Sequence, residues 1–285
     1  MKIACPAKIN LTLEILNRRD DGYHNVRSVM VPLALYDELE IGPAASFSFR
    51  CDDPALENQD NLVVRAVRAL DPALNVAISL SKRIPSQAGL GGGSSDAAGV
   101  LRAALQGALA RSFKVDWVSV ARSLGSDVPF FLVESGALVE GTGERVTATG
   151  SLPDWHVLAI TPPVAVPTAA AYAKLDALRR PARSRNDSVS IRMLAALQRA
   201  DFRTVLELLS NDFHDAIAES TPEVAGAIDA MRRAGARRVL LAGSGSSVFT
   251  LARDASTIAA IADRLNLDDR YRRIVTHFAR SDAWR

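Results

Sequence analysis

I-P-S-Q-A-G-L-G-G-G-S-S-D-A-A, residues 84–98, is a glycine-rich turn between a predicted strand and a predicted helix. The strand covers residues 76–80, which alternate in hydrophobicity, and the helix covers the Ala- and Leu-rich residues 97–105. Such a turn presents unpaired backbone N–H groups and the positive end of a helix dipole. The sequence therefore predicts an anion site, most naturally for phosphate, with an ordinary helix-capping turn as the alternative.

The turn matches neither of the two common nucleotide-binding loops. A P-loop requires a lysine after its last glycine, and no lysine follows here. The dinucleotide fingerprint, counted from Gly89, requires glycine at the position of Ser94. A different class of phosphate-binding loop is therefore expected.

Composition limits the classes of function. The chain has 285 residues, of which 48% are hydrophobic and 23% charged, as in ordinary globular proteins. A net charge of +2 without a polybasic block gives no support for nucleic-acid binding. Cys5 and Cys51 have neither metal-site spacing nor a disulfide framework, and no signal peptide or membrane-length apolar run is visible. We expect a cytoplasmic protein with no nucleic-acid or membrane partner.

Strands and helices are mixed along the chain, which indicates an α+β fold with two lobes, residues 1–150 and 151–285. Ligands prefer the cleft between such lobes. The predicted strands are residues 9–16, 26–35, 37–41, 46–51, 76–80, 137–141, 144–149, 155–161, 238–242, 247–252 and 271–279. The predicted helices are residues 61–70, 97–105, 117–124, 168–178, 188–199, 202–209, 222–234 and 256–265.

Three further segments are candidates for chemistry. In the first strand, Lys8 and Asn10 lie on the face opposite Ile9 and Leu11. Spacing alone allows either a solvated lysine at the strand start or a lysine that faces a cleft.

Asp127 lies between a glycine and an apolar run, so it is either a turn aspartate or a partly desolvated acid. The segment A-G-S-G-S-S-V-F, residues 242–249, is either a plain hairpin or a place where the backbone approaches a ligand.

Together these segments resemble the superfamily of small-molecule kinases that includes galactokinase, homoserine kinase and mevalonate kinase. Within it, the chain is similar to the kinases of 4-diphosphocytidyl-2-C-methyl-D-erythritol in the non-mevalonate isoprenoid pathway. The resemblance covers essentially the whole chain. It rests on P-A-K-I-N-L at 6–11, D-G-Y-H at 21–24, the glycine loop, G-S-D-V-P-F-F at 125–131, V-P-T at 166–168, R-N-D at 185–187 and residues 242–249.

Three positions depart from the family pattern. Gln87 replaces a usual glycine, Ser126 a commoner alanine, and His214 a usual glutamate. None removes a group that the chemistry needs, and no role is assigned to His214.

The resemblance implies a two-lobed kinase fold with a deep cleft, in which the γ-phosphate of ATP moves to a hydroxyl of the substrate. Asp127 would be the general base or a positioning group for that hydroxyl. Lys8 would keep the carboxylate ionised and stabilise charge on the transferring phosphoryl group. The alternative between base catalysis and positioning stays open.

The resemblance also implies an ATP site, with Mg²⁺ carried by the phosphates and no dedicated protein metal site. Ser94 or Ser95 would orient a phosphate or the metal, and Lys82 would lie near the nucleotide base. The residues implied for ATP are Lys82, Pro85, Gly89, Leu90, Gly91, Gly92, Gly93, Ser94 and Ser95.

The implied partner is a small molecule with a cytidine diphosphate group. Tyr23 would stack on cytosine and His24 would read its edge. Pro167 and Thr168 would close over the cytidine end, and Asn10, beside Lys8, would also bind the substrate. Two rival hypotheses are a related kinase acting on another alcohol, against which D-G-Y-H and V-P-T argue, and a non-catalytic binding protein, which would be expected to lose Lys8, Asp127 or the loop.

Overall fold

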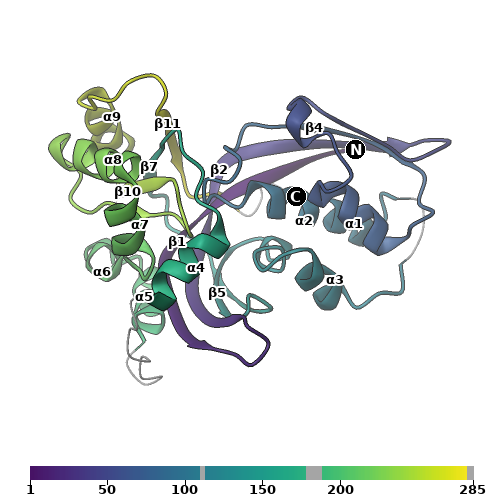
Figure 1. The fold of residues 1–285 in the computed structure, drawn as a ribbon, viewed down its shortest axis with the longest axis horizontal. Helices are drawn as coiled ribbons and strands as arrows, with labels where there is room; N and C mark the ends of the chain where they lie inside the picture. The colour runs from purple at the N-terminus through teal and green to yellow at the C-terminus, as the bar shows by residue number, and fades with distance from the viewer. Residues whose placement is uncertain (110–112, 178–187, 281–285) are drawn as a thin grey trace.

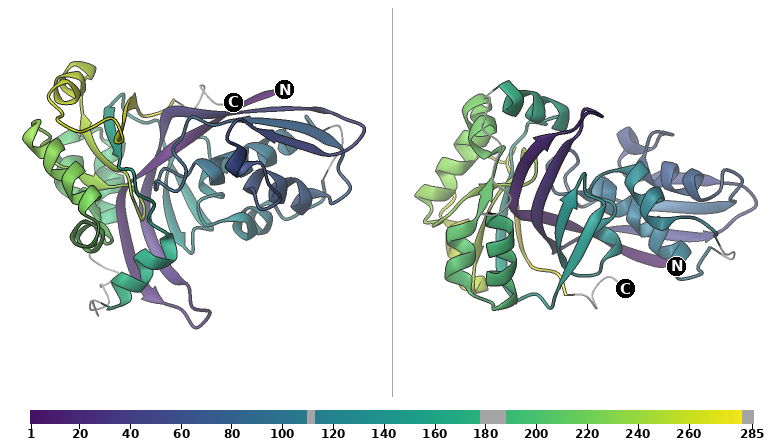
Figure 2. Two further views of the ribbon diagram at one scale, coloured as in Figure 1. Left: turned by 45° about the horizontal axis from the view of Figure 1, so that its top comes forward. Right: turned by 90° about the horizontal axis from the view of Figure 1, so that it is seen from below.

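The structure is a computed structural model that describes residues 1–109, 113–177 and 188–280. Its named strands form one sheet of seven and one of four. In Figure 1 the long strands β1 and β2 run between a group of helices that includes α1–α3 and another that includes α7–α9. The turned views in Figure 2 agree, with the blue helices and the green-to-yellow helices on opposite sides of the purple strands.

The seven-stranded sheet is built on an antiparallel pair, β1 (Lys2–Arg18) and β2 (His24–Pro43). Its order is β3-β4-β2-β1-β8, and β5 pairs with both β2 and β6. The shorter strands are β3 (Ser48–Cys51), β4 (Val76–Ser81), β5 (Gly136–Gly141), β6 (Arg145–Gly150) and β8 (Ser210–Asn211). β8 runs parallel to β1, with Leu13 opposite Asn211.

Helices α1 (Leu62–Leu70), α2 (Gly92–Leu105) and α3 (Trp117–Leu124) pack with this sheet around one apolar core. The side chain of Asn61 accepts a hydrogen bond from Val63 N and fixes the start of α1, and Asp116 does the same for α3. Two 3₁₀ turns, Pro54–Leu56 and Phe130–Leu132, lie in the connections.

The four-stranded sheet has the order β11-β7-β10-β9. Its strands are β7 (His156–Thr161), β9 (Leu240–Leu241), β10 (Val248–Ala252) and β11 (Arg272–His277). The remaining helices are α4 (Thr168–Ala177), α5 (Val189–Gln198), α6 (Phe202–Leu208), α7 (His214–Ser220), α8 (Pro222–Arg233) and α9 (Ala255–Asp263). A second core joins the two sheets, because Ile9 and Leu11 of β1 pack in the same cluster as Val157 of β7 and Phe249 of β10.

The mixture of helices and strands confirms the predicted α+β class. The bounds differ in places: β1 begins at Lys2 instead of residue 9, and α2 begins at Gly92 instead of residue 97. Residues 26–35 and 37–41 were predicted as separate strands, but they belong to one continuous strand, β2. The short strand β8 and helix α7 were not predicted, because two and seven residues carry too little periodicity. The R-N-D segment, residues 185–187, and residue 178 of a predicted helix lie outside the described residues.

The described residues contain no helix that is both long and apolar enough to cross a membrane. β8 brings residues from beyond position 150 into the seven-stranded sheet, and Phe278 forms an isolated bridge with Leu33 of β2. A domain boundary at residue 150 stays a prediction.

Candidate active site

A cleft of about 1600 Å³ opens where β1, the glycine-rich loop before α2, the turn after α3, the start of α4 and the turn between β9 and β10 meet. Leu90, Ser95 and Lys82 are not among its lining residues. The sequence-predicted residues that do line it are Lys8, Asn10, Tyr23, His24, Pro85, Gly89, Gly91, Gly92, Gly93, Ser94, Asp127, Pro167 and Thr168.

The glycine-rich loop passes directly over β1 and then starts α2. The backbone N–H of Lys8 donates to the carbonyl oxygen of Leu90 over 2.9 Å. Gly91 precedes the helix with φ +75°, a left-handed conformation that glycine adopts without strain. A Cβ atom at Gly91 would lie 2.8 Å from Cγ of Lys8. The first N–H groups of α2 lack helical partners, so the loop offers them to an anion beside Lys8.

A second glycine turn, residues 242–245, is docked against this loop. The N–H of Ser247 donates to the carbonyl oxygen of Ala88 over 3.1 Å. A Cβ atom at Gly89 would overlap the carbonyl oxygen of Ala242, so this close approach requires glycine. The two turns therefore form one continuous backbone surface on the cleft wall.

Lys8 and Asp127 meet at the floor of the cleft. The distance from Lys8 Nζ to Asp127 Oδ2 is 3.3 Å, and their side chains are 4% and 33% exposed. Lys8 Nζ also donates to Asn10 Oδ1 over 2.9 Å, and Asn10 Nδ2 donates to Ser28 Oγ over 2.8 Å. The ammonium is thus fixed in position, while the carboxylate keeps access to solvent and to a ligand.

The predicted alternation of β1 explains the position of Lys8. Ile9 and Leu11 are fully buried in the core between the sheets, so Lys8 and Asn10 face the other way and reach the cleft. Asp127 lies in the turn between α3 and the 3₁₀ helix that starts at Phe130, and that turn is closed by a hydrogen bond from Val128 N to the carbonyl oxygen of Gly125.

The far end of the cleft is aromatic. Tyr23 lines it with 68% of its surface exposed. The ring of His24 stacks on Tyr172 of α4 with centroids 4.8 Å apart and planes at 16°, and its Nε2 lies 2.9 Å from Asp176 Oδ1. Burial, with the charges of Asp127 and Asp176, raises the pKa of Tyr172 to about 12, so its hydroxyl stays protonated. This end can hold a flat ring.

Pro167 and Thr168 lie where α4 begins, beside the second glycine turn. Thr168 Oγ1 lies 2.9 Å from Ser244 Oγ, which joins the two segments across the cleft edge. Ser94 faces the cleft, whereas Ser95 is fully buried and its hydroxyl has no hydrogen-bond partner. Of the two serines, only Ser94 is placed to contact a ligand in the cleft.

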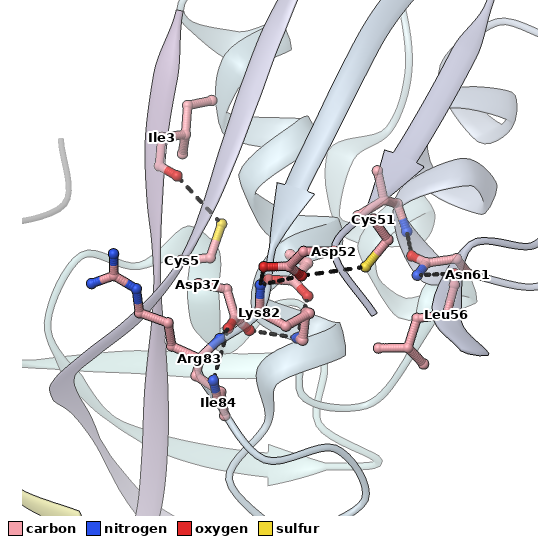
Figure 3. A network of polar contacts seen from close by, with 12 residues as sticks. Ile3, Cys5, Asp37, Cys51, Asp52, Leu56, Asn61, Lys82, Arg83 and Ile84 are labelled. Atoms are coloured by element: carbon pink, nitrogen blue, oxygen red, sulfur yellow. Dashed lines mark hydrogen bonds and ion pairs between the residues drawn. The ribbon is translucent and has the colours of Figure 1, made fainter. Parts of the chain in front are cut away.

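Lys82 lies behind the loop and not in the cleft. Its Nζ is 2.5 Å from Asp37 Oδ2 and 2.8 Å from Asp96 Oδ2, and both carboxylates are buried. Figure 3 shows Lys82 beside Asp37, to which the backbone N–H groups of Arg83 and Ile84 also donate. The structure therefore does not bring Lys82 to the surface that a nucleotide would contact.

Some cleft residues were missed at the level of sequence. Tyr172 is four residues after Thr168 on one helix, a spacing that places both on the same face, and this signal could have identified it. Asp176 follows at the same spacing. Arg18, Arg65 and Arg122 also line the cleft and give it a basic rim, but isolated arginines carry no sequence signal.

Among the residues that the structure describes, no group of three or more His, Cys, Asp or Glu side chains is arranged to hold a metal ion.

Comparison with known proteins gives consistent results. Residues 61–135 match the family described as the GHMP kinases N terminal domain, and residues 193–268 match the GHMP kinases C terminal family. A curated protein from Deinococcus radiodurans, named 4-diphosphocytidyl-2-C-methyl-D-erythritol kinase, is 39% identical over 266 residues, 91% of this chain and 87% of its own. A protein of the same name from Symbiobacterium thermophilum is 39% identical over 93% of this chain and 95% of its own.

Comparison with solved structures supports the same family. A crystal structure of 4-(cytidine 5'-diphospho)-2C-methyl-D-erythritol kinase superposes with a TM-score of 0.76 at 34% identity and covers 98% of this chain and 100% of its own. Mevalonate kinase of L. major in complex with R-mevalonate superposes with a TM-score of 0.68 at 16% identity, over 99% of this chain and 96% of its own, which indicates a shared fold alone.

Proposed function

The chain belongs to the family of 4-diphosphocytidyl-2-C-methyl-D-erythritol kinases, and from that premise we propose that it transfers the γ-phosphate of ATP to a hydroxyl of 4-diphosphocytidyl-2-C-methyl-D-erythritol. It is a small-molecule kinase with the GHMP kinase fold. The observation that carries the proposal is the contact of Lys8 with Asp127 in a cleft that has a phosphate loop at one end and stacked aromatic rings at the other.

We propose that Asp127 orients the substrate hydroxyl and accepts its proton as the bond to phosphorus forms. Its carboxylate is one third exposed, so a hydroxyl can reach it. Lys8 holds a positive charge 3.3 Å away, where it stabilises the charge that spreads over the transferring phosphoryl group. Asn10 contributes by holding the Lys8 ammonium in place.

The triphosphate is proposed to lie along Gly89–Ser94 at the start of α2. The free N–H groups of this helix start and the nearby ammonium both favour an anion. Leu90 contributes through its backbone, because its carbonyl oxygen ties the loop to β1, and Pro85 lines the loop entrance. A contact of Lys82 with the nucleotide is not part of this proposal, because its ammonium is held by Asp37 and Asp96.

Mg²⁺ is proposed to enter with ATP. The hydroxyl of Ser94 and the carboxylate of Asp127 are among the oxygen groups that line the cleft, and they suit a hard cation that keeps most of its ligands from phosphates and water. When bound, the ion neutralises phosphate charge. Ser95 is excluded from this role because its hydroxyl is buried.

The cytidine is proposed to bind at Tyr23, His24 and Tyr172. The stacked pair of His24 and Tyr172 presents a preformed flat surface, and the exposed ring of Tyr23 can close on the opposite face of a base. Pro167 and Thr168 border this end of the cleft. A cytoplasmic location and two lobes divided at residue 150 remain predictions.

The test is an ADP-release assay with Mg²⁺ and ATP. The substrates are 4-diphosphocytidyl-2-C-methyl-D-erythritol, the same compound without cytidine, homoserine, mevalonate and galactose. We expect turnover with the first compound alone. Turnover with another alcohol and none with the first would keep the kinase assignment and overturn the substrate.

A further inference from the structure

The second glycine turn, residues 242–245, forms part of the cleft wall, and three hydrogen bonds of the Asn211 and His214 side chains hold it and the residue that leads into it. Asn211 Nδ2 donates to the carbonyl oxygens of Leu241 and Gly243 over 2.8 and 2.7 Å. The N–H of Leu241 donates to Nδ1 of His214 over 3.2 Å. Both backbone polar groups of Leu241 are thus held by side chains three residues apart.

This arrangement is anchored to the catalytic strand. Asn211 belongs to β8, which pairs with β1 at Leu13. The Oδ1 atom of Asn211 accepts from the N–H of Phe213 over 2.9 Å, so all hydrogen-bonding positions of its amide are used except one lone pair. The amide group cannot rotate without losing three hydrogen bonds at once.

The turn that is held in this way touches the reacting groups. A Cβ atom at Gly243 would lie 3.1 Å from Nζ of Lys8 and 3.1 Å from the carbonyl oxygen of Gly89. A shift of the turn by a fraction of an ångström would therefore move the wall against Lys8 and the phosphate loop. Position matters on this scale for phosphoryl transfer, in which the protein acts mainly by positioning and charge.

We propose that Asn211 and His214 are positioning residues that fix the second glycine turn against Lys8, and that His214 performs this role only as a neutral imidazole. The proposal rests on the proposed kinase function and assigns two residues to its site. A protonated imidazole carries a hydrogen on Nδ1, so it would present a donor to the N–H of Leu241 in place of an acceptor.

The surroundings of His214 favour the neutral form. Burial lowers the pKa of His214 below its ordinary 6.5. The charged groups that face it are Asp215 on its own helix, which opposes this shift, and Arg232 of α8 and Arg238 before β9, which add to it. The hydrogen bond is therefore intact at neutral pH and is lost as the pH falls below that lowered pKa.

Two substitutions at His214 test separately the loss of its hydrogen-bond acceptor and the loss of its ability to become charged. His214→Asn places an oxygen near the position of Nδ1 and cannot titrate, so we expect kcat within about threefold of the wild type and a flatter decline at acid pH. His214→Leu removes the acceptor, so we expect kcat to fall about tenfold at neutral pH, with the KM for ATP little changed, and this difference from the wild type should narrow at acid pH, where the wild type has itself lost the bond. His156→Asn on β7, outside the cleft, is the matched control and should keep the wild-type pH profile.

Asn211→Asp should have the larger effect. It keeps an acceptor for Phe213 N but turns a carboxylate oxygen toward two carbonyl oxygens, and we expect kcat to fall about 100-fold. Because this variant could be unstable, Asn211→Ala is measured beside it, and thermal unfolding is recorded for both.

Hydrogen exchange of the peptide that covers Leu241 and the turn is the readout that needs no substrate. After correction for intrinsic rates, exchange should be faster in His214→Leu at neutral pH and in the wild type at acid pH, and unchanged in His214→Asn. Exchange and pH profiles equal to the wild type in both His214→Leu and Asn211→Ala would overturn the proposal. Failure of the wild type to phosphorylate the cytidylylated substrate would overturn only the proposed function, since the exchange measurement is independent of it.

Discussion

Two buried lysines of this protein, Lys8 and Lys82, each contact carboxylates, and their side chains are only 4% and 10% exposed. Lys8 meets one carboxylate, Asp127, which is one third exposed and lines the cleft. Lys82 meets two, Asp37 and Asp96, which are 0% and 3% exposed. The Lys8 ammonium therefore contacts a carboxylate that a ligand can reach, whereas the Lys82 ammonium contacts acidic side chains that are buried.

The difference teaches that a buried charge does not by itself identify a catalytic group. Structural ion pairs and active sites share burial and close contacts. In this protein the exposure of the carboxylate that contacts the lysine distinguishes the active site from the structural ion pair. A carboxylate that lines a cleft can leave its lysine to contact a substrate, whereas a fully buried carboxylate cannot. Four predictions test this contrast.

Replacing Lys8 should have the largest effect. Lys8→Met removes the charge beside the transferring phosphoryl group, so we expect kcat to fall about 10³-fold or more. Asp127 is partly exposed and keeps its hydration, so the fold should survive. Steady-state kinetics and a circular dichroism melt test both points, and a kcat within tenfold of the wild type would contradict the assignment.

Replacing Lys82 should act on stability instead. Lys82→Met leaves the buried Asp37 carboxylate without its cation and the buried Asp96 without the ammonium that it contacts, and we expect the free energy of unfolding to fall by about 3–5 kcal/mol. The matched control is Lys2→Met, because the Lys2–Glu38 pair is exposed and its loss should cost less than about 1 kcal/mol. Urea denaturation measures both. A Lys82→Met enzyme of normal stability with a greatly raised KM for ATP would instead show that Lys82 binds the nucleotide.

Gly91 and Gly92 are neighbours in the loop, but Gly91 faces Lys8 and Gly92 faces Asp37, the partner of Lys82. Gly91 has a positive φ, and its added Cβ would press on Lys8, so Gly91→Ala should lower kcat about tenfold. At Gly92 the added Cβ would meet Ile84 and Asp37 at 3.0 and 3.2 Å, so Gly92→Ala should affect kcat less. The bulkier valine at either position should raise the KM for ATP, because it blocks the approach of the phosphates. Equal kcat values for the two alanine variants would argue against this division.

The last contrast concerns pH, where the change is small for each pH unit. Burial is the main cause that raises the pKa of Asp96 from 3.8 to about 8; the charge of Asp37 adds to this and that of Lys82 opposes it. Because the folded state binds the proton more tightly, its stabilising contribution is full below about pH 4 and is lost as the pH rises to about 8. Asp96→Asn cannot lose a proton, so its stability relative to the wild type should rise across this window by less than about 1.4 kcal/mol per pH unit. Denaturation curves at several pH values test this, and parallel pH dependence of the two proteins would refute it.

The sequence predicts those parts of the site that depend on residues close together along the chain. Alternation in the first strand separates Lys8 from Ile9, and the glycine run predicts the phosphate loop from its own residues. The environment of Lys82 could not be predicted, because Asp37 is 45 residues away and its approach depends on the register of β2 with β4.

The contacts of the second glycine turn could not be predicted either, because they also involve residues that are distant in the sequence. Residues 242–245 allow a plain hairpin or a ligand wall, and contacts with Asn211, Ala88 and Gly89 make them part of the cleft. None of those contacts has a signature in the segment itself. The sequence predicts two strands, residues 26–35 and 37–41, where β2 is continuous, and Asp37 within β2 contacts Lys82.

The pairing of β1 with β8 also sets an order of events on the ribosome. Leu13 is among the first residues made, and its partner Asn211 follows roughly 200 residues later, about 10–40 s at ordinary rates of translation. Until then that edge of β1, the strand that carries Lys8, lacks its native neighbour and is open to wrong pairing. The cleft is completed only when the C-terminal half has been made, because residues 166–169 and 243–245 form part of its wall.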